Sequence, residues 1–413
     1  ALIKNGAGIY TLSSSNSMSG GVTLNAGGIY LGSSQALGSG TLAFNGGRLA
    51  ASGSSRTLAN DVNLNGDVHL GKVDGSGNSL TINGNINLGG GYRTITLDNS
   101  FTAGGTISNG SLEIDGGALQ RNFTITGNSA LGSINVLGGN LRLTGTGALS
   151  SSGSLDLSGS TGATSLDISG LTGAGTTIGS MSGATNSSVV LGAKNLAVGG
   201  NHNSANFAGS ISGTGGVTKD GSGKLTLSGS NSYTGATTVA AGNLTVNGSI
   251  AGSATTVQSG ATLGGSGTVG ALEIASGGTL APGNSPGTLS ASSAIWNGGG
   301  TYAWEINNFL GSAGTNWDFL NIAGALTISA TSGNKFVIDV ISLLAENNLA
   351  GNASNFDMTS SYSFAIATAA GGISGFDAAY FDILTNHFSN SMGSPGASGS
   401  WSITQSGNSI NLN

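Results

Sequence analysis

The segment Gly283-Asn284-Ser285-Pro286-Gly287 has the spacing of the G-x-S-x-G nucleophile elbow found in hydrolases. In that elbow the residue after the serine donates its backbone N–H to the oxyanion, and Pro286 has no N–H to donate. A helix should also follow the serine, but the sequence shows no helical pattern there. The segment therefore predicts a turn, and no catalytic residue is assigned to it.

Four carboxylates are the other candidates for catalysis. They are Glu113 with Asp115, and Asp156 with Asp167, which occupy matching places in the twin segments 154–159 and 165–170. Glycosidases need two carboxyl groups about 5–9.5 Å apart, a distance that the sequence does not define. Since carboxylates are common on the exposed face of a strand, a polysaccharide-degrading enzyme is the least favoured interpretation.

Metal ligands are sparse in this sequence. His69, His202 and His387 lie far apart, and none has a second histidine two or four residues away. Zinc requires three or four converging ligands, so we expect these histidines at the surface. The tandem G-G-x-G-x-D series that binds calcium is also absent. We expect no resident cofactor, although an opportunistic Ca²⁺ at turn carboxylates remains an option.

Four tyrosines offer a different chemistry. An exposed row of aromatic rings can stack on sugars, and the candidates for such a platform are Tyr10, Tyr30, Tyr92 and Tyr233. Tyr233 aligns with the apolar Met18 in the repeat described below. That alignment favours packing of these side chains against the coil over a sugar platform.

The composition limits which elements can carry these residues. The chain has 413 residues, with 77 Gly and only 3 Pro, and 37% of its residues are hydrophobic while 7% are charged. Collagen would need Gly at every third position and much more Pro. A disordered chain would be more charged and less hydrophobic. The composition therefore predicts many tight turns between short apolar strands.

Charge and cysteine content exclude other classes. The 11 Lys and Arg residues form no cluster, so no nucleic acid partner is predicted. No apolar run approaches the ~18 residues that span a membrane, so no transmembrane segment is predicted either. Cysteine is absent, as a long stack of strands needs no disulfides. Because the chain opens on Ala1, we expect that a leader was removed or that the chain is a fragment.

Internal repetition is the strongest signal of the fold. Residues 4–20 match residues 219–235 at a constant offset of 215, which aligns Lys4 with Lys219. The match continues further along the chain, where Gly27 aligns with Gly242. Between the two copies, looser units join a glycine turn to a short segment of alternating apolar and polar residues, as in 40–46, 79–84, 111–116 and 139–145. Such strands bury their apolar face only by stacking. We therefore predict an all-β fold, a right-handed parallel β-helix or β-solenoid over 1–290.

The composition changes near residue 290. The segment 291–413 contains 15 of the 23 aromatic residues, including Trp296, Trp304, Trp317 and Trp401. Its apolar runs are also longer, as in 335–341. We predict a smaller, compact C-terminal β domain over 291–413, with a short helical turn near 378–384.

Several segments resemble a known family. Residues 221–239, with 207–219 upstream and 280–289 downstream, are similar to the autotransporter-associated β-strand repeat, also called the passenger-associated transport repeat. The segments around Trp317 and Trp401 look like the C-terminal region of PEP-CTERM-type surface proteins. This resemblance implies a β-solenoid passenger that is secreted, extracellular or on the outer surface of a bacterial cell.

The sequence thus favours a structural or adhesive role without catalysis. The first interpretation is a self-associating surface or filament subunit, because a repeat begins almost at once and the segment Ala1-Leu2-Ile3-Lys4 would present an open strand edge for assembly. The expected partner in that case is a second copy of the chain. The alternative is an adhesin or glycan-binding module whose partners are cell-surface glycans.

Overall fold

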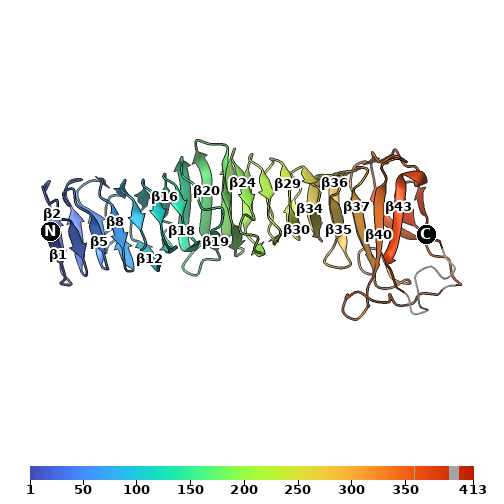
Figure 1. The fold of residues 1–413 in the computed structure, drawn as a ribbon, viewed down its shortest axis with the longest axis horizontal. Helices are drawn as coiled ribbons and strands as arrows, with labels where there is room; N and C mark the ends of the chain where they lie inside the picture. The colour runs from blue at the N-terminus through green and yellow to red at the C-terminus, as the bar shows by residue number, and fades with distance from the viewer. Residues whose placement is uncertain (358, 390–399) are drawn as a thin grey trace. The chain divides into compact units, whose positions relative to one another are not determined.

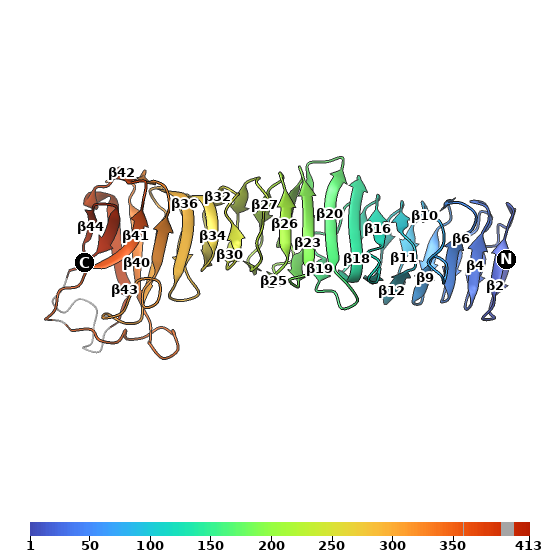
Figure 2. The ribbon, with the colours of Figure 1, turned by 180° about the vertical axis from the view of Figure 1, so that it is seen from behind.

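The computed structural model describes residues 1–357, 359–389 and 400–413. The chain divides into two compact units, Ala1–Gly215 and Gly216–Asn413. Each unit is a parallel β-solenoid in which short strands stack coil upon coil, drawn blue to green for the first unit and yellow-green to red for the second (Figure 1 and, from behind, Figure 2). The predicted all-β solenoid is confirmed. No helix of the described residues is long and apolar enough to cross a membrane.

Three parallel ladders build the first unit. The first ladder contains β1 (Leu2–Lys4), β3 (Val22–Leu24), β5 (Leu42–Phe44), β8 (Val62–Leu64), β11 (Ile86–Asn87), β14 (Ile107–Ser108) and β17 (Ser129–Ala130). The second contains β2 (Ile9–Leu12), β4 (Gly28–Leu31), β6 (Arg48–Ala51), β9 (Val68–Leu70), β12 (Tyr92–Leu97), β15 (Ser111–Asp115), the start of β18 (Ser133–Gly145), β19 (Ser154–Leu157), β22 (Ser180–Gly183) and β25 (Ala205–Phe207).

The third ladder contains β7 (Arg56–Leu58), β10 (Leu80–Ile82), β13 (Phe101–Ala103), β16 (Asn122–Ile125), the end of β18, β20 (Thr164–Leu171), β23 (Ser187–Gly192) and β26 (Ser210–Gly213). Strands β21 (Gly175–Ile178) and β24 (Asn195–Val198) form a further parallel pair.

Alternation along each strand sets the core of the first unit. Leu42 and Phe44 of β5 are 0% and 1% exposed, while Ala43 between them points outward. The same inward pattern holds for the apolar residues of the other predicted segments, Leu80, Ile82, Leu112, Ile114, Leu141 and Leu143. Each fully buried side chain of this size contributes ~1.5–3 kcal/mol. In the first coils the paired residues lie 20 positions apart, as in Leu2 with Val22 and Val22 with Leu42.

A column of asparagines fixes one corner of these coils. Asn5, Asn25, Asn45 and Asn65 each follow a strand of the first ladder. The amide Nδ2 of each donates to Oδ1 of the one before it, at 2.6, 2.6 and 2.8 Å. Stacked amides of this kind satisfy one another along a parallel ladder. A slip of one residue would break the whole column, so it helps to define the register.

The second unit has two main parallel ladders. One contains β27 (Val217–Lys219), β29 (Thr237–Val239), β32 (Thr255–Val257), β34 (Thr268–Ile274), β36 (Thr288–Trp296), β38 (Phe319–Ile322) and β41 (Phe364–Ala369), with short strands β31 (Ser249–Ile250), β39 (Leu326–Ile328) and β42 (Ile373–Ser374) beside it. The other contains β28 (Lys224–Leu227), β30 (Gly242–Val246), β33 (Ala261–Gly265), β35 (Thr279–Pro282), β37 (Thr301–Ile306), β40 (Phe336–Ser342) and β43 (Phe381–His387).

The parallel ladders run through the predicted boundary at residue 290. Strand β36 spans it, pairing with β34 on one side and with β38 and β39 on the other. The parallel stacking ends later, where β45 (Ser409–Leu412) pairs with β41 in antiparallel fashion and forms a hairpin with β44 (Ile403–Ser406). Trp296, Tyr302, Trp304, Phe336 and Phe364 are buried within these same ladders. A separate domain over 291–413 is therefore not shown by the fold.

The predicted helical turn near 378–384 is shorter than expected. A 3-10 turn, η1, covers Ala378–Tyr380, and the Asp377 carboxylate accepts a hydrogen bond from the Ala379 N–H at its start. From Phe381 the chain is strand β43, because Phe381 pairs with Phe336 of β40 and is almost fully buried.

Candidate functional site

One outward column on the second ladder of the first unit gathers polar side chains. Thr94, Glu113, Asn135 and Asp156 occupy the same position in four successive coils. Adjacent strands lie about 4.8 Å apart, so neighbouring members of this column touch. We call these four residues, with Tyr92 beside them, the Glu113 face.

Glu113 is the centre of this face. Its Oε2 accepts hydrogen bonds from the Tyr92 hydroxyl at 2.8 Å and from Asn135 Nδ2 at 2.9 Å, and its Oε1 accepts from Thr94 Oγ1 at 3.2 Å. The Tyr92 side chain nevertheless stays 50% exposed. Burial raises the pKa of the Tyr92 phenol, which keeps the hydroxyl a donor. The result is an aromatic ring held in place beside a carboxylate and an amide, all facing solvent.

The four candidate carboxylates are spread over two ladders, with Glu113, Asp115 and Asp156 on the second and Asp167 on the third. Asp156 lies on the second ladder and accepts from the N–H and hydroxyl of Ser158, whereas Asp167 lies on the third ladder and pairs with Arg142 at 3.1 Å. Asp115 accepts from Thr161 Oγ1 at 2.7 Å. Burial acts to raise the pKa of Asp167, but hydrogen bonds from Ser169 and then Arg142 outweigh it and lower that pKa. Each of these three carboxylates thus accepts hydrogen bonds from neighbouring side chains or backbone of the solenoid.

The four tyrosines are dispersed. Tyr233 is 0% exposed, and its hydroxyl lies 2.7 Å from Thr237 Oγ1, which in turn lies 2.7 Å from Ser253 Oγ. Burial raises its pKa to about 12. Tyr10 and Tyr92 are half exposed, and Tyr30 lies under the Lys72 ammonium, 5.6 Å from its ring centre. Packing is thus confirmed for Tyr233, and Tyr92 is the ring with the polar surroundings of a ligand platform.

The histidines lie at the surface, as predicted, in separate places. His69 Nδ1 is 3.3 Å from Asp98 Oδ2, which also binds Arg48, and His387 Nδ1 is 2.9 Å from Asp339 Oδ1. Within the described ranges, no three His, Asp or Glu side chains gather closely enough to hold a metal ion. The absence of a cofactor and the opportunistic Ca²⁺ both stay predictions.

The Gly283–Gly287 segment is the predicted turn, and strand β36 follows it directly. The sequence did not reveal what lies beneath it. The Gly287 N–H donates to Oδ1 of the buried Asp318 at 2.9 Å, and Ser285 of the turn lies close to the Glu305 carboxyl. Two carboxyl groups 13 positions apart in the sequence therefore meet under this turn, where the coil from β37 returns to β38.

The lysine repeated at an offset of 215 closes a corner of the coil. Lys219 is 1% exposed, and its Nζ donates to the carbonyl oxygens of Asp220 at 2.6 Å, Gly221 at 2.7 Å and Ala241 at 3.1 Å. Lys4 binds the equivalent carbonyls of Gly6 and Ala26. Burial lowers the pKa of Lys219, against the effect of the Asp220 charge. The carbonyl oxygens are therefore the groups that compensate this buried ammonium.

A glycine completes the same corner in both copies. Gly27 and Gly242 have positive φ angles of 72° and 61°. A Cβ atom on Gly27 would run into the carbonyl oxygen of Gly6, and one on Gly242 would run into that of Gly221. The lysine donates a hydrogen bond to this carbonyl oxygen, and the glycine leaves room for it because it has no Cβ. This explains why the repeat contains both residues.

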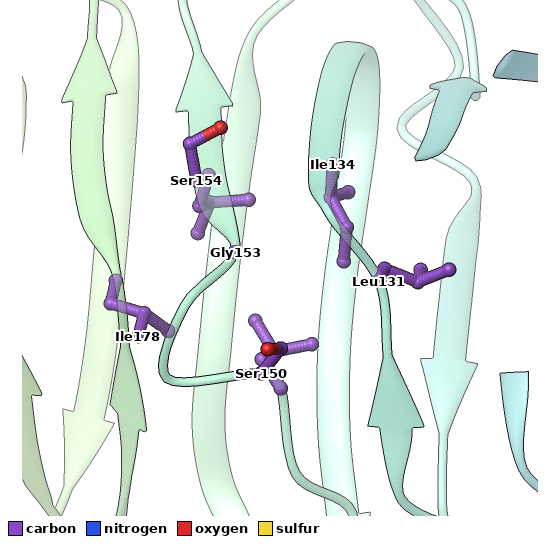
Figure 3. A pocket seen from close by; sticks show the side chains of 8 residues that line it. Leu131, Ile134, Ser150, Gly153, Ser154 and Ile178 are labelled. Carbon is purple, nitrogen blue, oxygen red and sulfur yellow. The ribbon is translucent and has the colours of Figure 1, made fainter. Parts of the chain in front are cut away.

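A small cavity lies where the first ladder of unit 1 is interrupted after β17 (Figure 3). Its volume is about 10 Å³, about enough for one water molecule. Mostly apolar residues line it: Leu131, Ile134, Leu149, Ser150, Gly153, Ser154, Leu155 and Ile178. No sugar ring fits there, so the cavity is a packing gap.

The predicted assembly edge, Ala1–Lys4, contains strand β1. Leu2 pairs with Val22 of β3, and no second strand of the described residues pairs with β1. Ile3 points outward and is 63% exposed. Assembly through this edge stays a prediction.

Comparison with known proteins identifies the two matching segments. The family model of the passenger-associated transport repeat matches residues 2–29 and 217–246. The chain carries two passenger-associated transport repeats. Their starts are 215 positions apart, and each repeat opens one of the two compact units. The lysine corner belongs to these repeats. The resemblance of the C-terminal region to PEP-CTERM-type proteins stays a prediction.

A curated relative points to the same class. The chain is 34% identical over 170 residues to the protein "Adhesin BmaC autotransporter" of Brucella suis biovar 1 (strain 1330). The match covers 37% of this chain and 5% of that adhesin. The chain therefore spans a small fraction of this relative. The repeats, the relative and the β-solenoid fit a passenger or adhesin of the cell surface.

Proposed function

We propose that this chain is an adhesive, non-catalytic part of an exported passenger at the bacterial surface, and that it binds cell-surface glycan through the Glu113 face. The observation that carries this proposal is the exposed Tyr92 ring, held by its hydroxyl on Glu113 next to the Asn135 amide. Sugars bind proteins by stacking on aromatic rings and by hydrogen bonds to carboxylates and amides, and a flat β face can supply both.

Other features support an adhesive role. The matched relative is named an adhesin, and both proteins carry a related segment of 170 residues. The ladders give a rigid support, because each outward side chain of the Glu113 face is fixed by a strand on either side. A rigid face loses little conformational entropy when a ligand binds.

Replacing Tyr92 with alanine should weaken glycan binding about two- to tenfold, because stacking on one aromatic ring contributes ~0.5–1.5 kcal/mol. Glu113→Gln should have a smaller effect, since it keeps the shape but removes the charge. Binding is measured on a glycan array and then by titration with the best glycan. Tyr10→Ala is the matched control, because Tyr10 is equally exposed, at 52%, and lies outside the Glu113 face. Equal binding by the Tyr92 and Tyr10 variants would refute this face as the site.

Self-association is a second candidate, favoured by the exposed outer side of β1. We infer that a strand of a second copy would add to Leu2–Lys4, as strands add to open sheet edges in general. Such a head-to-tail contact does not close and produces filaments. A preceding coil in a longer chain would occupy the same edge and prevent it.

Negative-stain microscopy of the purified chain at neutral pH tests this second candidate. We expect filaments whose number rises with protein concentration. The Ile3→Asp variant places a charge at the exposed edge position and should yield single particles. Single particles from the unmodified chain at high concentration would end this idea and leave the glycan proposal untouched.

A further inference from the structure

The buried carboxylate of Asp318 ties three segments of the second unit together. The side chain is 0% exposed. Its Oδ1 accepts from the Gly287 N–H at 2.9 Å, and its Oδ2 accepts from the Glu305 N–H at 3.1 Å. The Asp318 N–H donates back to the Glu305 carbonyl at 2.9 Å. The turn 283–287, strand β37 and the start of β38 are therefore joined through one residue.

Asp318 also closes the base of a loop over residues 307–316. Ile306 pairs with Trp317 in an antiparallel bridge, and the Asn307 N–H donates to the Asn316 carbonyl at 2.8 Å. The loop is one of those that project beside β40 and β43 (Figure 2). It is anchored by Phe309, which is 4% exposed and has its ring centre 4.8 Å from that of Tyr362. Leu310 beside it is 74% exposed.

Glu305 brings a second carboxyl group to the same place. It lies close to Ser285 of the turn. Burial, and after it the nearby Glu305 charge, raise the pKa of Asp318 well above its ordinary value, and burial raises the pKa of Glu305 as well. The folded structure thus favours the protonated form of both carboxyl groups.

Few other titratable groups face this pair. On the outward side of the neighbouring strands lie Asp339 of β40, which pairs with Ala303, and His387 of β43, and these two side chains bind each other at 2.9 Å. Strand β37 contributes Tyr302, whose hydroxyl donates to the Ile366 carbonyl at 3.0 Å. The turn 283–287, the loop 307–316, and strands β38 and β41 contain no ionisable side chain. The ion pairs of the described residues include neither Glu305 nor Asp318. A second negative charge would therefore be buried without a cation to compensate it.

We propose that Glu305 and Asp318 form a proton-controlled latch for the 307–316 loop. The latch is closed while at least one of the two carboxyl groups holds a proton. When both ionise, their repulsion and desolvation favour opening of the turn and the loop, which brings water to the charges. Opening would release Phe309 from its aromatic neighbours and change the exposed apolar surface around Leu310.

The direction of the pH dependence follows from the raised pKa values. The folded state holds a proton that the unfolded or open state loses, so the stabilisation is fully present below the ordinary carboxyl pKa of about 4. It is lost as the pH rises through the raised values. The loop should therefore be most protected in acid and should open on the alkaline side.

Hydrogen exchange of the full chain between pH 4 and 9 tests the latch. Protection factors for residues 307–316, which correct for the intrinsic effect of pH on exchange, should fall at least tenfold across this range. Glu305→Gln removes one of the two charges and keeps a group that can bond to Ser285, so its protection should stay high to a higher pH. Glu346→Gln is the control, because it makes the same change at an exposed position.

Asp318→Asn provides the second variant. Its NH2 group would face one of the two backbone N–H donors, so protection of the loop should be lower at every pH and no longer depend on pH. If Glu305→Gln kept the pH profile of the unmodified chain, the latch would be refuted. That result decides the question even if Asp318→Asn does not fold. Neither outcome bears on glycan binding at the Glu113 face, which lies in the other unit.

Discussion

Replacing Lys219 with methionine should lower the free energy of unfolding by about 3 kcal/mol, since hydrogen bonds to charged groups contribute ~1.5–3 kcal/mol each and the ammonium makes three of them. Methionine keeps the apolar stem in its place but leaves the carbonyls of Asp220, Gly221 and Ala241 without this donor. The gain from no longer burying a charge keeps the loss below the sum of the three bonds.

Urea unfolding followed by circular dichroism measures this effect. Lys224→Met is the matched control, because Lys224 is an exposed lysine of the same repeat. We expect its transition to move by less than ~0.5 kcal/mol, as is usual for surface substitutions. If the two variants had the same transition midpoint, the corner would owe its stability to the backbone and to Gly242 rather than to the lysine.

A loss of about 3–5 kcal/mol is expected for Trp296→Ala, the usual cost of removing a large aromatic side chain from a core. Trp296 is 0% exposed. Its ring stacks on Phe336 with centres 4.8 Å apart and an angle of 5°, and its edge meets Tyr302 at 5.8 Å. These rings connect β36 with β37 and β40, so the cavity would weaken both ladders of the second unit.

Trp296→Phe separates packing from hydrogen bonding. Among the described residues the buried Nε1 of Trp296 has no hydrogen-bond partner, so phenylalanine removes an unsatisfied donor while it keeps the stack on Phe336. The loss should therefore be less than half of that for Trp296→Ala, as measured by calorimetry of the full chain. Similar losses for the two variants would show that the indole itself, and not the stack, carries the stability.

The fold could be predicted because it depends on local alternation. Segments such as 40–46 and 111–116 place apolar residues at every second position, and the structure turns Leu42, Phe44, Leu112 and Ile114 inward. Glycine turns between such segments, repeated along the chain, favour stacked coils. The sequence predicted one solenoid over 1–290, whereas the structure divides the chain at Gly215, where the second copy of the repeat opens the second unit.

The features that the sequence did not reveal all depend on contacts between segments that the stacking of the coils brings together. Lys219 is a polar residue in a strand, and its role requires the carbonyl of Ala241 from the next coil. Asp318 and Glu305 meet only because a loop returns to the ladder. The change of composition near residue 290 marks larger core residues, while β36 continues the stacking across it. The Glu113 face was partly foreseen, since Tyr92 and Glu113 were named separately.

The uniform coils at the start of the first unit have a consequence for length. Leu2, Val22, Leu42 and Val62 are 20 positions apart, and the asparagine column repeats at the same interval. Each coil contacts only the one before and the one after it. Removing or duplicating one such 20-residue segment would join surfaces that already match. The length of this stack of coils in the first unit can thus change in steps of one coil, about 4.8 Å each, with no new kind of contact.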